Sequence, residues 1–280
     1  MCKNEFKTYS IFGQSRNRAR MAHEISRKII WRNYSMKKYS KTEKYDKNWI
    51  NENWMGPNPL WLLEELCENL ELHPGMKVLD MGCGKGLTSV FLAKEYGVTV
   101  FANDLWISAT DNLRRFIDAG VADKVFPIHA EAHALPYADG FFDAAISIDS
   151  YEYFGADEIY FPCTYSKLVM PGGQFGIVVP GLKKEFDKGY PDTLKDFWAG
   201  DMFSFHSKSW WRRLWEKTGI VDIISCYDID DPKEIWRPWA DWALENFDKE
   251  WGEGGDTDDK FLRADINNDL ALVAMTARKK

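Results

Sequence analysis

The sequence predicts an α/β protein built on a doubly wound, mostly parallel sheet, and three observations lead to that prediction. Short apolar segments alternate with segments of helical periodicity from residue 77 to residue 179, the pattern of parallel strands joined by crossover helices. A glycine-rich turn follows the first of these apolar segments. With 280 residues, the chain can bury one principal core and still carry an insertion.

Seven strands are predicted in chain order, at 77–81, 98–102, 125–128, 144–148, 174–179, 220–227 and 270–277. A helix that Pro59 can open precedes the first strand, and the sequence His73-Pro74-Gly75 ends it. Further helices are predicted at 87–96, 108–119, 156–168 and 210–218. After Pro180 the alternation breaks, so residues 181–218 and 232–260 are predicted to be cap or insertion segments. The second contains a Trp-rich helix at 236–251 and an acidic loop at 252–260, interpreted as solvated surface.

Charge divides the chain into two parts. Residues 1–44 carry twelve Lys or Arg and three Glu, a net charge of +9, and the overall charge of −7 therefore leaves −16 for residues 45–280. A domain this acidic repels a phosphate backbone, which disfavours nucleic acid as a partner. The basic N-terminal arm has little apolar periodicity and is expected to be a flexible or dispensable extension, with an alternative start at Met36, or else a lid.

Composition excludes several classes of protein. No apolar run reaches the roughly 18 residues of a membrane span, and no signal peptide is recognisable, so a cytoplasmic location is expected. The five cysteines are scattered and are expected to be reduced thiols. The five histidines are equally dispersed, and no metal-binding spacing occurs, so no metal site is expected.

The chemistry is expected at the segment from Val78 to Gly86. Asp80 lies two residues before the first of three alternating glycines, Gly82, Gly84 and Gly86. Glycines let the backbone approach a ligand, and the amides at the following helix N-terminus can donate to it. Asp104 ends the next strand, 22 positions after Gly82, where a carboxylate can accept ribose hydroxyls. Two structural alternatives stay open: an ordinary strand-to-helix turn, and an Asp104 that caps the next helix.

These motifs resemble those of the class I S-adenosylmethionine-dependent methyltransferases, especially their small-molecule branch. Residues 80–86 resemble the first motif of that family, and Asp104 its ribose-binding acid. Residues 130–137 are similar to its adenine-contacting segment, with Glu131 where Asp is usual. Residues 168–173 resemble the turn before its fifth strand. The resemblance implies a Rossmann-like methyltransferase fold whose last two strands form an antiparallel hairpin.

The resemblance also implies S-adenosyl-L-methionine as cofactor and S-adenosyl-L-homocysteine as product. The methyl group would pass by direct in-line displacement to the N, O, S or C atom of a small molecule, without a metal ion. The cofactor-binding residues that it implies are Asp80, Gly82, Cys83, Gly84, Gly86, Asp104, Leu105, Glu131, Ala132 and Asp149.

Aromatic residues outside these motifs are candidates for the acceptor site. Tyr151 and Tyr153 follow the fourth strand, and His206 precedes a pair of tryptophans. Trp236, Trp239 and Trp242 recur every three residues, so one helical face presents a large apolar surface. This face either packs on the sheet or roofs an aromatic cavity suited to a small organic acceptor, a cationic amine included.

Three other functions share some of these features. An NAD-dependent oxidoreductase has a similar turn, but its glycines follow GxGxxG rather than the GxGxG found here. A nucleic-acid methyltransferase that acts on base amino groups commonly carries a polar-Pro-Pro-aromatic motif after the fourth strand, and residues 149–152 lack both prolines. A protein that binds S-adenosylmethionine without turnover is the third alternative.

Overall fold

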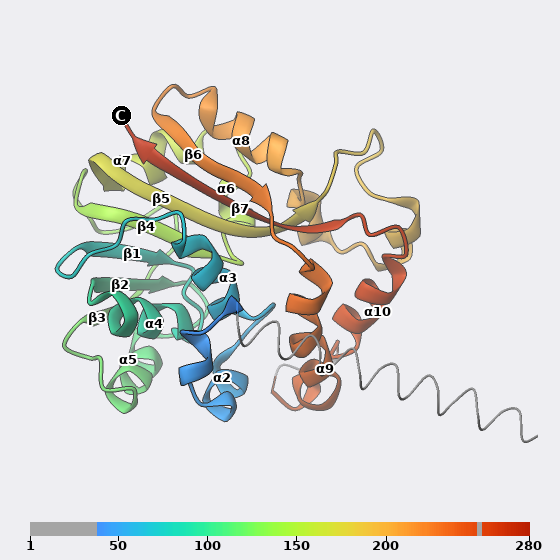
Figure 1. Ribbon diagram of the computed structural model, residues 1–280, viewed down its shortest axis with the longest axis horizontal. Coiled ribbons are helices and arrows are strands. Elements are labelled where there is room, and N and C mark those ends of the chain that lie inside the picture. Colours follow the sequence, from blue (N-terminus) through green and yellow to red (C-terminus); the bar gives the residue numbers. More distant parts are fainter. Residues whose placement is uncertain (1–37, 251–253) are drawn as a thin grey trace, which may run out of the picture. The chain divides into compact units, whose positions relative to one another are not determined.

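The computed structural model describes residues 38–250 and 254–280 (Figure 1). The chain divides into two units, Met1–Lys44 and Tyr45–Lys280. Within the first unit, residues 38–44 are described, and they include the short 3-10 helix η1 (Thr42–Lys44). The predicted arm up to residue 37 and the alternative start at Met36 lie outside the described residues.

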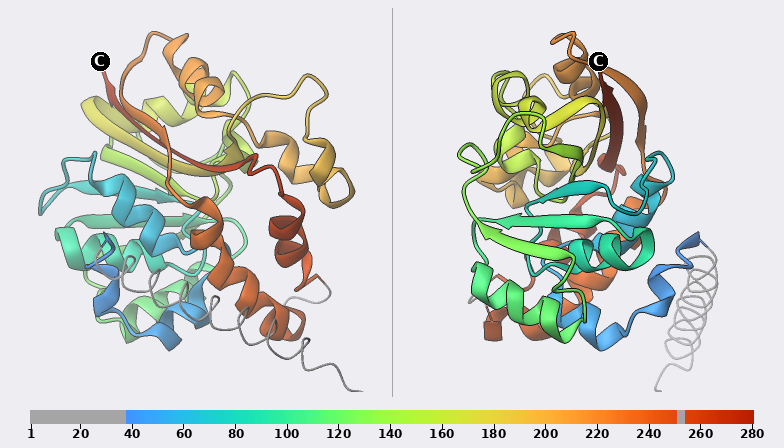
Figure 2. Two further views of the ribbon diagram at one scale, coloured as in Figure 1. Left: turned by 45° about the vertical axis from the view of Figure 1, so that its right-hand side comes forward. Right: turned by 90° about the vertical axis from the view of Figure 1, so that its left-hand side faces the viewer.

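One seven-stranded sheet forms the centre of the second unit (Figures 1 and 2). Its strand order is β3-β2-β1-β4-β5-β7-β6. Strands β1 to β5 pair in parallel, whereas β7 runs antiparallel to both β5 and β6. This confirms the predicted fold class, including the antiparallel C-terminal pair. The strands are β1 (Lys77–Met81), β2 (Thr99–Asp104), β3 (Val125–His129), β4 (Phe142–Ile148), β5 (Val169–Leu182), β6 (Val221–Asp228) and β7 (Leu270–Lys279).

Helices cover both faces of this sheet (Figure 2). The helices that precede or connect the first five strands are α2 (Lys47–Asn53), α3 (Pro59–Cys67), α4 (Leu87–Tyr96), α5 (Ala109–Asp118), α6 (Glu152–Gly155), the π-helix η2 (Phe161–Tyr165) and α7 (Ser166–Leu168). Those after β5 are the 3-10 helices η3 (Asp192–Phe197) and η4 (Gly200–Ser204), then α8 (Lys208–Glu216), α9 (Pro232–Glu250) and α10 (Thr257–Ala264). Within the described ranges, no helix is both long and apolar enough to span a membrane.

Alternation along the central strands divides the hydrophobic core into two clusters. In β1, Val78 belongs to a cluster with residues of α3, α4 and α9, whereas its neighbour Leu79 belongs to a cluster with residues of η2 and α8. Val178 and Ile177 of β5 divide in the same way. Because successive side chains of a strand point to opposite faces, each cluster fills one face of the sheet.

Two segments differ from their predicted structure. The helix predicted at 156–168 begins only at residue 160, and its part from Phe161 to Tyr165 is π-helical; Pro162 lies in the first turn, where a proline is tolerated. The acidic loop predicted at 252–260 is wrong from residue 257 onward, where α10 begins. Asp258 and Asp259 lie in its first turn, where the helix dipole favours negative side chains. Residues 251–253 lie outside the described part.

Candidate active site

The glycine turn connects β1 to α4. Gly82, Gly84 and Gly86 have φ angles of 71°, 53° and 82°. A Cβ atom on Gly82 would lie 1.9 Å from Ser150 Oγ, and one on Gly86 would lie 2.4 Å from the ring of Phe116. Both the backbone conformation and the available space therefore require glycine at these two positions.

Asp104, at the end of β2, is bound to this turn. Its Oδ2 accepts a hydrogen bond from the amide of Gly84 at 2.8 Å. Its Oδ1 accepts from the amides of Trp106 and Ile107 at 2.8 and 2.9 Å. A carboxylate has about four acceptor positions, so Oδ2 retains one for a ligand hydroxyl. The side-chain cap of α5 is Ser108, so Asp104 is not the cap of that helix.

A chain of side-chain hydrogen bonds supports the turn from the side of α5. Asn112, which is buried, donates from Nδ2 to the carbonyl oxygen of Gly84 at 2.9 Å. Arg115 donates to Asn112 Oδ1 and to Asn53 Oδ1, each at 3.1 Å. These residues were not predicted from the sequence. Asn112 and Arg115 lie three positions apart on the helix that follows Asp104, and this spacing places them on one face of that helix.

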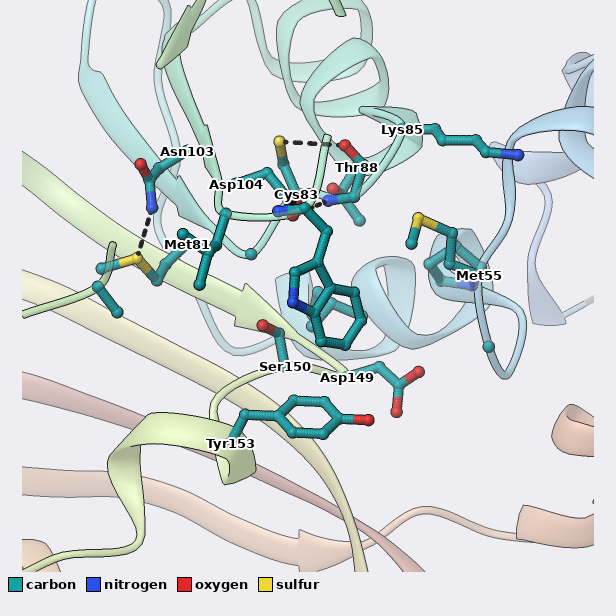
Figure 3. A pocket seen from close by; sticks show the side chains of 18 of the residues that line it. Met55, Met81, Cys83, Lys85, Thr88, Asn103, Asp104, Asp149, Ser150 and Tyr153 are labelled. Atoms are coloured by element: carbon teal, nitrogen blue, oxygen red, sulfur yellow. Dashed lines mark hydrogen bonds between the residues drawn. The ribbon is translucent and has the colours of Figure 1, made fainter. Parts of the chain in front are cut away.

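A cavity of about 260 Å³ lies against the glycine turn (Figure 3). Figure 3 shows Cys83 and Asp104 on one side of this space and Asp149 and Tyr153 on the opposite side. Eight of the ten cofactor-site residues predicted from the sequence line it, namely Gly82, Cys83, Gly84, Asp104, Leu105, Glu131, Ala132 and Asp149. Asp80 and Gly86 are not among the lining residues.

Asp80 lies behind the turn with 1% of its surface exposed. Its Oδ2 accepts hydrogen bonds from Thr88 Oγ1 at 2.7 Å and Ser89 Oγ at 2.5 Å, both in the first part of α4. Burial raises the pKa of this carboxyl to about 6, against the two hydroxyl donors, which lower it. Asp80 thus joins the end of β1 to the start of α4 and holds the turn between them.

The loop after β3 forms another wall of this cavity. The carboxylate of Glu131 accepts from the backbone amide of His133 at 2.9 Å and pairs with its Nδ1 at 2.7 Å. The hydrogen bond from His133 lowers the pKa of Glu131. Ala132 is buried, and its carbonyl oxygen accepts from the hydroxyl of Tyr160 at 3.3 Å. The side chain of Glu131 is therefore held beside the cavity by its own loop.

A second cavity, of about 610 Å³, adjoins the first. Six residues line both cavities, namely Met55, Gly56, Pro57, Trp106, Asp149 and Tyr153. At this boundary the rings of Trp106 and Tyr153 meet edge to face, with centroids 5.6 Å apart. Three of these residues, Met55, Gly56 and Pro57, lie between α2 and α3 and were not predicted for the site, although a Gly-Pro pair ahead of a helix is typical of a turn.

Two tryptophans of α9 form part of the second cavity. Trp236 and Trp239 line it and donate from their indole nitrogens to Asp258 Oδ1 and Oδ2, at 3.1 and 2.7 Å. Trp242 stacks on Trp239 with ring centroids 5.2 Å apart and is not among the lining residues. Asp258 also lines the cavity, so its interpretation as solvated surface is wrong, because α10 carries it onto the indoles of α9.

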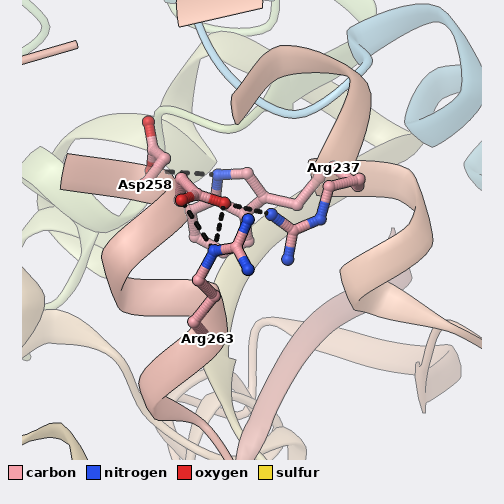
Figure 4. A network of polar contacts seen from close by, with 5 residues as sticks. Arg237, Asp258 and Arg263 are labelled. Carbon is pink, nitrogen blue, oxygen red and sulfur yellow. Dashed lines mark hydrogen bonds and ion pairs between the residues drawn. The ribbon is translucent and has the colours of Figure 1, made fainter. Parts of the chain in front are cut away.

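Arg237 of α9 and Arg263 of α10 point toward each other beside Asp258 (Figure 4), and both bind the neighbouring carboxylate, Asp259. Asp259 accepts from Arg263 Nε at 2.9 and 2.7 Å and from Arg237 Nη1 at 2.7 Å. The two arginines lower the pKa of Asp259, the hydrogen bond from Arg263 contributing most. This network ties α10 to α9 and positions Asp258 beside the cavity.

The three predicted acceptor-site residues lie in different places. Tyr153 is 52% exposed and borders both cavities. Tyr151 is fully buried among aromatic rings of the other core cluster, with the ring of Trp215 5.6 Å away, and lines neither cavity. His206 also lines neither: its ring stacks on Trp210 at 3.7 Å, and its Nδ1 lies 3.0 Å from Glu185 Oε2.

Asp149 follows β4 and borders both cavities. Its φ of 52° lies in the left-handed region, which few non-glycine residues adopt. A Cβ atom on Gly56 would lie 2.1 Å from Asp149 Oδ2, so that glycine is needed for the carboxyl to lie there. Burial, followed by the negative charge of Asp258, raises the pKa of Asp149 well above its ordinary value.

A cavity beside a glycine turn, at the carboxyl ends of parallel strands and with an acid after the second strand, is the site of a nucleoside-binding α/β protein. Comparison with known proteins makes the class specific. Residues 78–173 match a family described as a methyltransferase domain. The methyltransferase GfsG of Streptomyces halstedii is 33% identical over 189 residues, which cover 67% of this chain and 66% of that protein.

Other similar proteins extend this result. Sterol 4-C-methyltransferase strm-1 of Caenorhabditis elegans is 30% identical over 154 residues, covering 51% of this chain and 44% of that protein. Among solved structures, phosphoethanolamine N-methyltransferase 2 of Haemonchus contortus, in complex with S-adenosyl-L-methionine, has a TM-score of 0.66 at 20% identity, covering 88% of this chain and 58% of that chain. This chain thus spans 66% and 44% of the length of the two curated relatives.

The chain belongs to the class I S-adenosylmethionine-dependent methyltransferases. The resemblance seen in the sequence is thereby confirmed.

Proposed function

We infer that this protein transfers a methyl group from S-adenosylmethionine to a small-molecule acceptor. The observation that carries this proposal is the shared boundary of the two cavities. A methyl donor held in the first cavity and an acceptor held in the second would meet at Trp106, Asp149 and Tyr153. The similar proteins are named for sterol and phosphoethanolamine, which are small molecules.

The first cavity fits the nucleoside part of the cofactor. Gly82 and Gly84 keep the backbone free of side chains where a ligand must approach, and a Cβ atom on Gly82 would collide with Ser150. Asp104 retains an acceptor position on Oδ2 for a ribose hydroxyl. The adenine would lie between Leu105 and the loop of Glu131 and Ala132, where backbone contacts matter more than the Glu131 carboxylate, which His133 already holds.

Asp149 is proposed to bind the methionine end of the cofactor. That end carries an ammonium group, and Asp149 is a carboxyl on the boundary between the two cavities. A bound cation would favour the ionised form, which burial disfavours in the free protein. Asp80 and Gly86 are proposed to act indirectly, by fixing the turn.

When bound, the cofactor supplies a methyl group on a positively charged sulfur. The residues of the chain contribute position rather than covalent chemistry: the turn fixes the donor, and the aromatic walls of the second cavity fix the acceptor in line with it. Of the predicted acceptor-site residues, Tyr153 is the one we propose to contact the acceptor, because it borders both cavities.

Transfer of a labelled methyl group from S-adenosylmethionine tests this function. The purified chain is incubated with the labelled cofactor and fractionated metabolite pools, in parallel with the Gly82→Val variant. We expect label to appear in a small-molecule fraction with the unaltered protein and not with the variant. Label incorporated into nucleic acid alone, or none in any fraction, would contradict the proposal.

A further inference from the structure

We propose that the second cavity recognises an organic cation, so that the methyl acceptor is an amine that binds as its ammonium form. This inference rests on the proposed function, since it names the acceptor of that same site. The observation behind it is a pairing of carboxyl groups with aromatic walls in a cavity that continues the cofactor cavity.

Three carboxyl side chains line the second cavity. Asp149 comes from the end of β4, Glu152 from the start of α6, and Asp258 from the first turn of α10. None of the described residues that line this cavity is Lys, Arg or His. Glu152 and Asp258 belong to this cavity alone, whereas Asp149 also borders the cofactor cavity. The selectivity for the acceptor is therefore assigned to Glu152 and Asp258.

Six aromatic residues form part of the remaining wall, beside smaller and aliphatic residues such as Met55, Pro180 and Met202; the six are Trp106, Tyr153, Phe205, Trp236, Trp239 and Phe247. Aromatic faces attract cations through the negative charge of the π system, and more strongly where water is excluded. Trp236 and Trp239 are 6% and 4% exposed, and their N–H groups are already engaged by Asp258. Because each indole is held by one carboxylate oxygen, both rings and the carboxylate have fixed positions before any ligand binds.

A neutral apolar acceptor would fit this cavity less well. Filling it with an uncharged ligand would remove water from the carboxyl groups without supplying a positive charge in its place, which is unfavourable for buried charges. Burial, and after it the negative charge of Asp258, raises the pKa of Asp149, so the ionised form of this carboxyl is disfavoured in the free protein. An ammonium ion bound beside it would favour the ionised form.

A metal ion is a different kind of cation, and the geometry does not favour it. In the part of the chain that the structure describes, no three His, Cys, Asp or Glu side chains are grouped so that they could hold a metal ion. The carboxyl groups are instead spread around a cavity of about 610 Å³, which suits a larger ligand.

Transfer to a primary or secondary amine requires a lone pair on nitrogen. The ammonium group first gives one proton to the carboxylate of Glu152 or Asp258. The nitrogen lone pair then forms the N–C bond, and the electron pair of the broken C–S bond stays on sulfur. The products are a methylated ammonium ion, a protonated carboxyl and S-adenosylhomocysteine, so that atoms and charge balance.

Calorimetry with a matched pair of probes tests the inference. With the chain saturated by S-adenosylhomocysteine, choline is titrated against 3,3-dimethylbutan-1-ol, which has the same shape but no charge. We expect choline to bind about tenfold more tightly. The Glu152→Gln and Asp258→Asn variants should each lower the affinity for choline several-fold and leave that for the alcohol nearly unchanged. The control Asp241→Asn removes an exposed carboxylate of α9 that does not line the cavity and should change neither affinity.

The two proposals fail in different ways in this experiment. If S-adenosylhomocysteine itself does not bind, the proposed function is wrong. If it binds and the alcohol binds as tightly as choline, or if both variants keep the full preference for choline, the inference of a cationic acceptor is overturned. Thermal melting checks that each variant is folded, and Asp258→Asn keeps the test decisive if Glu152→Gln, which replaces a buried side chain, does not fold.

Discussion

The two adjoining cavities are built in different ways. The first is formed mainly by one stretch of chain, from the glycine turn to Asp149, and its best-defined contacts involve backbone groups, as in the amides that donate to Asp104. The second is assembled from segments far apart in sequence, and its best-defined contacts join side chains, as in the indoles that donate to Asp258. Because backbone contacts tolerate few residue types, the cofactor side has a sequence signature and the acceptor side does not.

The largest effect is expected from a change in the glycine turn. In Gly82→Val, the new side chain would meet Ser150 Oγ, and a branched residue would have to adopt a φ of 71°. Affinity for S-adenosylhomocysteine should fall more than about 100-fold. Gly120→Val is a matched control, because Gly120 has a φ of 69° with nothing within 4 Å. The Gly120→Val variant should lose stability but keep its affinity for S-adenosylhomocysteine. If both variants lose the same affinity, the loss comes from general backbone strain and not from the glycine turn.

The next effect concerns the acid after β2. In Asp104→Asn, the charge that attracts the amides of the turn and the ribose is lost. Affinity for S-adenosylhomocysteine should fall about 10- to 100-fold, because a charged hydrogen bond contributes roughly 1.5–3 kcal/mol. Asp111→Asn, an exposed change in the first turn of α5, serves as the control. Unchanged affinity in a folded Asp104→Asn protein would remove this residue from the site.

The role of Asp80 in holding the glycine turn is tested by the pH dependence of the free energy of unfolding. The pKa of Asp80 is about 6 when folded, against 3.8 ordinarily, so the folded protein binds this proton more tightly and gains stability as the pH falls through 6. Relative to Asp80→Asn, the free energy of unfolding of the unaltered protein should rise by about 1.4 kcal/mol between pH 7 and pH 5. Denaturant titrations at both pH values measure this difference. If the two proteins differ in free energy of unfolding by the same amount at pH 7 and pH 5, burial does not raise the pKa of Asp80.

Much of the cofactor side could be predicted because its constraints are local. The exact strand 77–81, the turn and Asp104 all follow from residue types that a backbone conformation or a close approach demands. Asp258 could not be predicted in this way, since its partners lie 22 and 19 positions away on another helix. Tyr151 and Tyr153 are two positions apart, yet one is buried and one exposed, because α6 begins between them and turns their side chains apart.

The smallest effect is expected on the acceptor side. Trp239→Phe keeps a ring in the second cavity but loses the N–H that donates to Asp258. The Michaelis constant for the acceptor should rise a few-fold, with affinity for S-adenosylhomocysteine unchanged. Trp211→Phe removes an indole N–H in the opposite core cluster, away from both cavities, and should affect stability alone. If the two variants behave alike, Trp239 belongs to the core and not to the acceptor site.

The central claim is that the cavity at the glycine turn binds S-adenosylmethionine, and calorimetric titration of S-adenosylhomocysteine, with NADH as the comparison ligand, tests it most directly. We predict one S-adenosylhomocysteine bound per chain and no heat of binding from NADH, because the turn has the GxGxG pattern and Asp104 lies where a ribose acceptor is needed. Binding of NADH in preference to S-adenosylhomocysteine, or binding of neither ligand by the folded protein, would contradict the claim.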